Sequence, residues 1–259
     1  MIDPLMELAQ RAARAAGSLL RDRSSRPRTG VGTKSSATDM VTDADRAAEG
    51  VIVRGILAER PGDAILGEER GEAGGSSGLR WVIDPLDGTT NFLFGVPQWA
   101  VSIACEDATG AILGVVYDPL REELFAAGRG RGATLNGEPI AVSTATDLSR
   151  ALVATGFSYR ADERAAAASI LPDLLTNVRD IRRAGAASLD LAWTAAGRVD
   201  GYYETPIEHW DVAAGTLLVR EAGGRTGALP SVGPSGEGLV AAGPGIFASL
   251  RELVLDLLG

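Results

Sequence analysis

The chain has 259 residues, of which 45% are apolar and 23% charged, and its formal net charge is −9 at pH 7. This composition is typical of a folded globular protein and excludes global disorder, and the length suits one large domain or two closely packed halves. Because the basic residues form no stripe, the charge argues against nucleic acid or an anionic membrane as the main partner and favours a cation.

The only cysteine, Cys105, cannot form an internal disulfide, so nothing in the sequence requires an oxidising compartment. Residues 1–23 carry apolar residues at helical spacing between charged ones, which predicts an amphipathic helix of the mature protein and no leader peptide. No segment approaches the roughly 20 apolar residues of a membrane span. We therefore expect a cytoplasmic protein.

A long surface loop is predicted over 23–39, because Gly, Ser, Thr and basic residues dominate this segment. A second helix is predicted to follow, capped by Thr42 and stopped by Pro61-Gly62. Asp43 and Asp45 fall in its first turn.

Short strands are predicted over much of the next 70 residues. Two of them, 64–67 and 81–84, deliver carboxylates where they end: Glu68 and Glu69 after the first, Asp84 at the end of the second. The later strands have no intervening helix and predict a largely antiparallel meander over 99–105, 112–118 and 123–128.

The pattern changes to alternating strands and helices past about residue 145, which predicts a second, α/β half. We therefore divide the chain into an N-terminal α+β half, 1–145, and a C-terminal α/β half, 146–259. Strands are expected at 151–156, 181–185, 199–204 and 238–243, and helices at 163–178, 186–197, 212–224 and 245–258.

The segment WVIDPLDGTTNF, residues 81–92, is the most informative motif. Pro85 pushes Asp84 into extended backbone, so the strand is expected to end there. Asp87 follows, and Gly88-Thr89-Thr90 suits a helix start whose free N–H groups could face an anion. By itself the motif fits two interpretations equally: a strand, turn and helix cap, or half of a metal site.

Two further segments favour the metal site. ILGEE at 65–69 and HWDVAAG at 209–215 each place an acid at a strand end or helix start. Three such edges in an acidic protein suggest one shared pocket, and carboxylate and carbonyl oxygens favour Mg²⁺ over softer metals.

Taken together, these segments resemble the signatures of the inositol monophosphatase family, which are Mg²⁺-dependent, lithium-sensitive phosphomonoesterases. The matching segments occur in the family's order and extend over nearly the whole chain: VTDAD at 41–45, GEE at 67–69, WVIDPLDGTTNF at 81–92, GATLNGEPI at 132–140, DGYYE at 200–204 and WDVAAG at 210–215. The resemblance implies a layered αβαβα sandwich, of the α+β or α/β class, like that of fructose-1,6-bisphosphatase.

The resemblance also implies the ligands of two or three Mg²⁺ ions. Glu68, Asp84 and the Leu86 carbonyl would bind a first metal, and Asp84, Asp87 and Asp211 a second. Two metals held by a bridging carboxylate can activate water and neutralise the leaving oxygen, so phosphoryl transfer needs no covalent nucleophile.

Other roles follow from the same resemblance. Thr89 and Asp45 would help to activate the attacking water, and Lys34 matches a catalytic loop. Substrate contacts would come from Gly88, Thr89, Asp87, Gly185, Ala187, Glu204 and Asp211. This chain has Ala186 where many relatives carry a hydroxyl, with Ser188 two positions later, so contacts to the leaving alcohol are less well defined than those to the metals.

Several other residues near these motifs could be taken for site residues but have a simpler interpretation. Glu69 suits a solvated neighbour of Glu68, and Asp43 a first-turn helix acid. His209, the only histidine, suits a rim or structural role.

The sequence thus predicts a phosphatase of inositol 1-phosphate or a related small polyol or sugar phosphate. Fructose 1,6-bisphosphate and histidinol phosphate are alternative substrates for the same site, and a 3′-phosphoadenosine nucleotide is the least favoured. A regulatory binding protein with secondary phosphatase activity is the alternative of another class. The family resemblance also suggests a homodimer.

Overall fold

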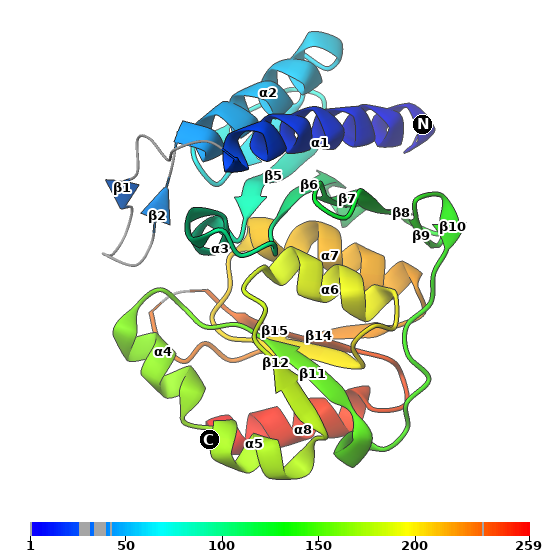
Figure 1. Ribbon diagram of the computed structural model, residues 1–259. Coiled ribbons are helices and arrows are strands. Elements are labelled where there is room, and N and C mark those ends of the chain that lie inside the picture. Colours follow the sequence, from blue (N-terminus) through cyan, green and yellow to red (C-terminus); the bar gives the residue numbers. More distant parts are fainter. Residues whose placement is uncertain (1, 26–31, 34–39, 42, 235) are drawn as a thin grey trace.

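The structure is a computed structural model that describes residues 2–25, 32–33, 40–41, 43–234 and 236–259. Thr42 and Lys34, for which a cap and a catalytic role are predicted, lie outside the described residues. The elements stack as helices, sheet, helices, sheet and helices (Figure 1). The αβαβα arrangement implied by the family resemblance is therefore confirmed.

The first layer contains α1 (Ile2–Ser24) and α2 (Asp43–Glu59), which cover one face of the first sheet (Figure 1). Small residues allow α1 to lie close to that sheet. A Cβ atom on Gly17 would lie 2.6 Å from the ring of Tyr117 on the sheet. Between the two helices, β1 (Gly32–Thr33) pairs with β2 (Met40–Val41) in antiparallel orientation.

Eight strands form the first sheet, in the order β10-β9-β8-β7-β6-β5-β3-β4. Their bounds are β3 (Ala64–Gly67), β4 (Gly71–Ala73), β5 (Arg80–Asp87), β6 (Ala100–Asp107), β7 (Gly110–Asp118), β8 (Glu123–Gly128), β9 (Ala133–Leu135) and β10 (Glu138–Pro139). Neighbours are antiparallel except β3 and β5, which are parallel. The predicted antiparallel meander is confirmed.

The middle layer contains α6 (Ala187–Ala195) and α7 (His209–Glu221), on the other face of the first sheet (Figure 1). A Cβ atom on Gly114 of β7 would lie 2.8 Å from the carbonyl oxygen of Ala214 on α7. Glycine at this position therefore lets α7 approach the sheet closely.

The second sheet has five strands in the order β12-β11-β13-β15-β14. Its strands are β11 (Leu152–Thr155), β12 (Asp180–Arg182), β13 (Gly201–Glu204), β14 (Arg225–Leu229) and β15 (Gly238–Ala242). β11 is parallel to both of its neighbours, whereas β15 is antiparallel to β13 and β14. The 3-10 helix η1 (Leu148–Arg150) precedes this sheet. The other helices of the described residues are α3 (Thr89–Phe94), α4 (Ala161–Ala168), α5 (Leu171–Asn177) and α8 (Phe247–Leu258).

Three apolar clusters hold the layers together. The first, with Ile52 and Trp81, fills the space between α1, α2 and the first sheet. The second joins residues of both sheets to α6 and α7, including Val82 and Tyr202. The third packs α5 and α8 against the second sheet through residues such as Leu250.

The predictions for some helices and strands were wrong. The single helix expected over 163–178 is two helices, α4 and α5, because Pro172 lies in the first turn of α5, where proline suits a helix start. β14 was not predicted, because its five residues lack an apolar alternation and it is specified by pairing with β15. The short strands β4, β9 and β10 were also missed.

Candidate active site

The strand β5 does not end at Asp84, as Pro85 had suggested, but continues to Asp87. Asp84 pairs with Ser102 and Asp87 with Ala100, so β5 advances three residues while β6 advances two. This extra residue is a β-bulge, a position where a strand tolerates proline. The bulge places both aspartates at one corner of the sheet.

The Asp84 side chain is buried and folds back on the chain. Its Oδ1 accepts a hydrogen bond from the Leu86 N–H at 3.0 Å, which forms the local turn. Asp84 therefore forms the turn and is available as a candidate metal ligand in the same conformation.

The helix α3 (Thr89–Phe94) begins directly after this corner, with Gly88 at its N-cap. Gly88 has φ 91°, and a Cβ atom there would lie 2.9 Å from the Gln98 carbonyl oxygen, so only glycine suits the position. The Thr89 Oγ1 lies 2.9 Å from Asp45 Oδ1 and 3.0 Å from the Leu86 carbonyl oxygen. A hydroxyl has one proton, so it donates to one of these at a time.

Asp87 connects this corner to α6. Its Oδ2 accepts hydrogen bonds from Ser188 N–H at 2.7 Å and from Ser188 Oγ at 2.5 Å, and its Oδ1 accepts one from Ala187 N–H at 3.2 Å. Ser188, two positions after the alanine that departs from the family pattern, therefore binds a candidate metal ligand.

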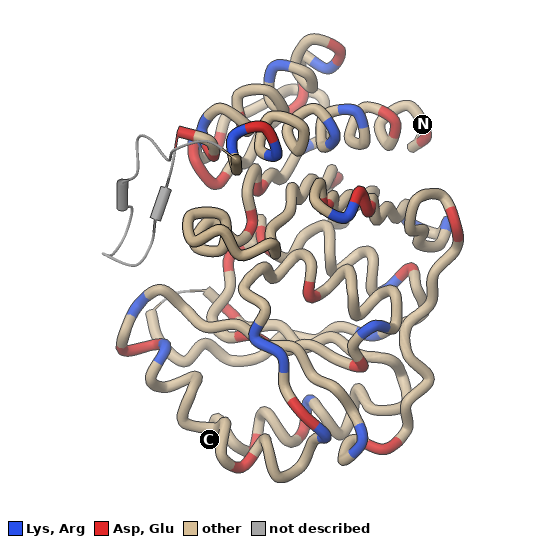
Figure 2. The backbone as a smooth tube through the Cα atoms, in the orientation of Figure 1, with Lys and Arg blue, Asp and Glu red and all other residues tan. Residues whose placement is uncertain are grey.

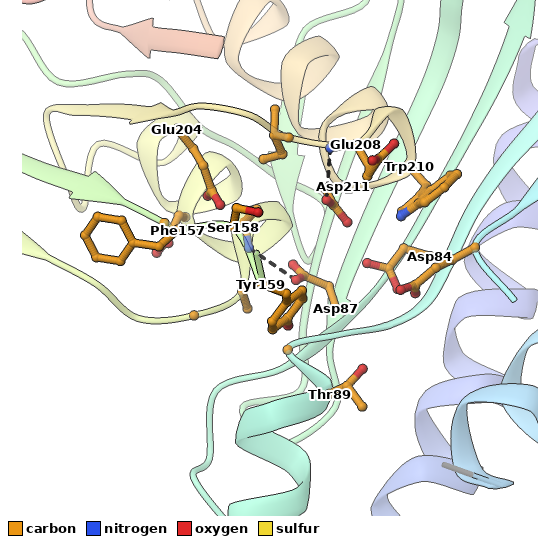
Figure 3. Close-up of a pocket in the computed structure, with 18 of the residues that line it drawn as sticks. Asp84, Asp87, Thr89, Phe157, Ser158, Tyr159, Glu204, Glu208, Trp210 and Asp211 are labelled. Carbon is orange, nitrogen blue, oxygen red and sulfur yellow. Dashed lines mark hydrogen bonds between the residues drawn. The ribbon is translucent and has the colours of Figure 1, made fainter. Parts of the chain in front are cut away.

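Asp211 lies in the first turn of α7. Its Oδ2 accepts a hydrogen bond from Glu208 N–H at 3.3 Å, and the two residues form a capping box. The cap fixes the beginning of α7, and in Figure 3 Asp84, Asp87 and Asp211 face a common space.

A pocket of about 390 Å³ lies at this corner. It brings together ten of the residues predicted to form the site: Glu68, Asp84, Leu86, Asp87, Gly88, Thr89, Gly185, Ala187, Glu204 and Asp211. Asp45 reaches the site through its contact with Thr89.

The pocket lining also includes residues that the sequence did not point to: Phe157, Ser158, Tyr159, Arg160, Arg183 and Asp190. Figure 3 shows Phe157, Ser158 and Glu204 on the side of the pocket away from Asp84. Apart from Glu204, these residues lie in segments that carry no motif, and only the nearness of Asp190 to Gly185 in the sequence could have suggested that residue.

The carboxylates of the pocket destabilise one another. Burial, together with the charges of Glu68, Asp87 and Asp211, raises the pKa of Asp84 well above its usual range. Burial also raises the pKa of Asp211, with Asp87 and Glu68 adding to the shift. Figure 2 shows acidic positions along the chain where β5 runs toward the second sheet. A cation would relieve this repulsion.

The donor atoms fit a hard divalent cation, because buried carboxylate and carbonyl oxygens are what Mg²⁺ prefers. Within the described ranges, however, no three His, Cys, Asp or Glu side chains are grouped so that they could already hold an ion. Asp87 and Asp211 instead accept hydrogen bonds from α6 and from Glu208. These hydrogen bonds hold both carboxylates in place, and each carboxylate keeps further lone pairs for a cation.

Residues with a simpler interpretation lie outside the pocket. The His209 Nε2 is 2.9 Å from Glu106 Oε1, in line with a structural role. Asp43 lies in the first turn of α2, and its Oδ1 is 3.6 Å from Nη1 of Arg46. Glu69 directs its N–H toward the carboxylate of Glu49.

Fold and site together describe a layered α/β protein with a carboxylate-rich pocket between its two sheets. A family model described as "Inositol monophosphatase family" matches residues 1–252. The chain therefore belongs to the inositol monophosphatase family. In the part of the chain that the structure describes, no helix has the length and apolar character needed to cross a membrane.

Relatives carry two kinds of name. The protein called Nus factor SuhB of Escherichia coli is 47% identical over 223 residues, which cover 85% of this chain and 84% of that protein. The crystal structure of the extragenic suppressor protein SuhB of Bartonella henselae has a TM-score of 0.90 at 37% identity, covering 97% of this chain and 98% of the other. The inositol monophosphatase of Anabaena has a TM-score of 0.86 at 36% identity, covering 98% and 96%.

Proposed function

We propose that this chain is a Mg²⁺-dependent phosphomonoesterase that hydrolyses inositol 1-phosphate or a related small polyol or sugar phosphate. The observation that carries the proposal is the group of mutually repelling carboxylates, Glu68, Asp84, Asp87 and Asp211, in one pocket. Family membership supports phosphatase chemistry in general.

The proposed metal ligands are Glu68, Asp84, Asp87, Asp211 and the Leu86 carbonyl oxygen, for two or three Mg²⁺ ions. When bound, Mg²⁺ would supply activation of water and neutralisation of phosphoryl charge. The chain itself provides Thr89 and Asp45 to orient the attacking water and to accept its proton, and their 2.9 Å contact supports this role.

The substrate would lie between this corner and the opposite wall. The backbone N–H groups of Gly88 and Thr89 would bind the phosphate. Glu204 would accept hydrogen bonds from substrate hydroxyls, with Gly185 and Ala187 beside them. The Tyr202 hydroxyl donates to Glu204 Oε2 at 2.7 Å, which fixes this carboxylate, and burial raises the pKa of Glu204 to about 7.

Lys34 would add a further catalytic contact from the segment before α2. Fructose 1,6-bisphosphatase or histidinol-phosphatase activity remains the alternative at the same site. We also propose a cytoplasmic homodimer whose activity is inhibited by lithium.

The test is phosphate release from a panel of inositol 1-phosphate, fructose 1,6-bisphosphate, histidinol phosphate and 3′-phosphoadenosine 5′-phosphate, with Mg²⁺ and with a chelator. We expect Mg²⁺-dependent release that is fastest from the polyol or sugar phosphates. Folded protein that releases no phosphate from any of them in Mg²⁺ would contradict the proposal.

A second candidate function is a regulatory binding role. It is favoured by the names of the relatives, which are called Nus factor SuhB and are not named after an enzymatic activity. The Asp87→Asn variant separates the two roles. If it loses hydrolysis and a cell carrying it has an unchanged phenotype, the binding role is the physiological one. A phenotype equal to that of a deletion would favour catalysis.

A further inference from the structure

One face of α2 is fully buried, and its residues are of two chemical kinds. Asp45, Glu49, Ile52 and Ile56 are all inaccessible to solvent, at spacings of four, three and four residues. These spacings place them along one side of the helix. Ile52 and Ile56 anchor α2 in the apolar core, whereas Asp45 contacts Thr89 at the candidate site. Glu49 lies between them and has no part in the function proposed above.

Glu49 contacts the turn that carries Glu68. Its Oε1 accepts hydrogen bonds from Glu69 N–H at 3.2 Å and from Arg70 N–H at 3.4 Å. Its Oε2 lies 3.2 Å from Nε of the half-exposed Arg70. The Glu68 N–H donates to the Ile83 carbonyl oxygen of β5 at 3.1 Å. The turn is therefore held from two sides, by β5 and by Glu49.

The sequence before Glu68 is adapted to this contact. A Cβ atom on Gly67 would lie 2.0 Å from Glu49 Oε1. Gly67 does not have a positive φ, so its backbone would accept alanine, and the space for the Glu49 carboxylate is what requires glycine.

A carboxylate at this position is costly, because burial removes its hydration. An apolar side chain like those of Ile52 and Ile56 would fill the core without that cost, but it could not accept hydrogen bonds from the turn. The acceptor geometry, and not the packing, is what the glutamate adds.

We propose that Glu49 is a positioning residue that holds the 68–70 turn so that Glu68 can bind Mg²⁺. The inference rests on the function proposed above. Through Asp45 and Glu49, the same face of α2 then supports the water-activating pair and the Glu68 ligand together.

The test is calorimetric titration of the metal-free protein with Mg²⁺, with melting temperature measured in parallel. Glu49→Ala should weaken Mg²⁺ binding about 10- to 100-fold, the usual effect of removing a group that orients a ligand. Glu49→Gln should restore most of the affinity, because its side-chain carbonyl still accepts from the turn. Ile52→Ala, on the same helix face, is the matched control and should lower the melting temperature while leaving Mg²⁺ affinity within about twofold of wild type.

Gly67→Ala tests the same contact without removing the glutamate, and serves if Glu49→Ala does not fold. Its new methyl group should displace the Glu49 carboxylate and weaken Mg²⁺ binding in the same direction. Gly55→Ala on α2, where a Cβ atom meets nothing within 4 Å, is its control and should bind Mg²⁺ like wild type.

Unchanged Mg²⁺ affinity in folded Glu49→Ala, or in Gly67→Ala if the former does not fold, would overturn the inference. A wild-type protein that binds no Mg²⁺ would instead contradict the proposed function, so the two failures are distinguishable.

Discussion

The two walls of the pocket are built differently. At the β5 corner, Asp84, Asp87 and Thr89 lie within six residues of each other in sequence, and hydrogen bonds to α2, α6 and the local backbone fix each side chain. The opposite wall is assembled from separate segments that carry Phe157, Arg183 and Glu204. We infer that the first wall determines the chemistry and the second the choice of substrate, so variants on the two walls should have different kinetic signatures.

The largest effect is expected from Asp84→Asn at the β5 corner. Losing the proposed bridging ligand should lower kcat by about 100- to 1,000-fold, the scale of losing one preorganised electrostatic contact. In a chelator the same variant should melt at a higher temperature than wild type, because asparagine removes a buried carboxylate that its neighbours repel. Phosphate-release assays and thermal melts measure the two effects, and a lower melting temperature in chelator would contradict the electrostatic explanation.

Thr89→Ala is expected to come next. Removing the hydroxyl that contacts Asp45 should lower kcat about 100-fold, as for the loss of a proton-transfer group, with little change in KM. Thr89→Ser keeps the hydroxyl and should retain most of the activity. Steady-state kinetics check this prediction, and equal losses in both variants would show that the methyl group matters instead.

Glu204→Gln tests the opposite wall. The loss of a charged acceptor should lower kcat/KM for inositol 1-phosphate about 10- to 100-fold, mainly through KM. An aryl phosphate without hydroxyls, such as 4-nitrophenyl phosphate, should be hydrolysed almost as by wild type. Loss of activity toward both substrates would assign Glu204 to the chemistry.

Ser188→Ala should have a smaller effect on the β5 corner. The variant loses the Oγ bond to Asp87 but keeps the backbone bonds, so Mg²⁺ affinity should fall about 10-fold. Titration calorimetry measures the change. Ser169→Ala, whose exposed hydroxyl contacts only its own helix end, is the control and should leave binding unchanged.

His209→Ala should have the smallest effect on activity, within about twofold, because its ring contacts Glu106 and lies outside the pocket lining. Burial raises the pKa of Glu106, but hydrogen bonds from His209 and Arg80 outweigh it and lower the pKa overall. A lowered pKa in the folded state contributes stability at neutral pH that is lost as the pH falls through that pKa. The variant should therefore be less stable at pH 7, and the difference from wild type should shrink in acid. Urea unfolding at several pH values checks this, and a difference that grows in acid would contradict it.

The sequence predicted the β5 corner better than the opposite wall for a physical reason. The strands at 64–67 and 81–84 are short apolar runs, and carboxylates at their ends follow from local spacing. The continuation of β5 past Pro85 was missed because a bulge depends on pairing with β6, which the local sequence does not specify. The bond between Asp87 and Ser188 joins residues 101 positions apart, so it too depends on the fold.

The opposite wall depends almost wholly on such distant contacts. Phe157 and Arg183 stack with 5.8 Å between the guanidinium carbon and the ring centroid, yet neither residue lies in a recognisable motif. Glu204 was found only through the resemblance of DGYYE to the family. Side chains that gather from separate loops leave no local pattern in the sequence.

The most direct test of this division is the ratio of kcat/KM for inositol 1-phosphate to kcat/KM for 4-nitrophenyl phosphate, measured in Mg²⁺ for wild type, Thr89→Ala and Glu204→Gln. We predict that Thr89→Ala lowers both values and leaves the ratio within about twofold of wild type, whereas Glu204→Gln lowers the ratio about 10-fold or more. Equal ratios in all three proteins would contradict the assignment of chemistry to the β5 corner and of substrate choice to the opposite wall.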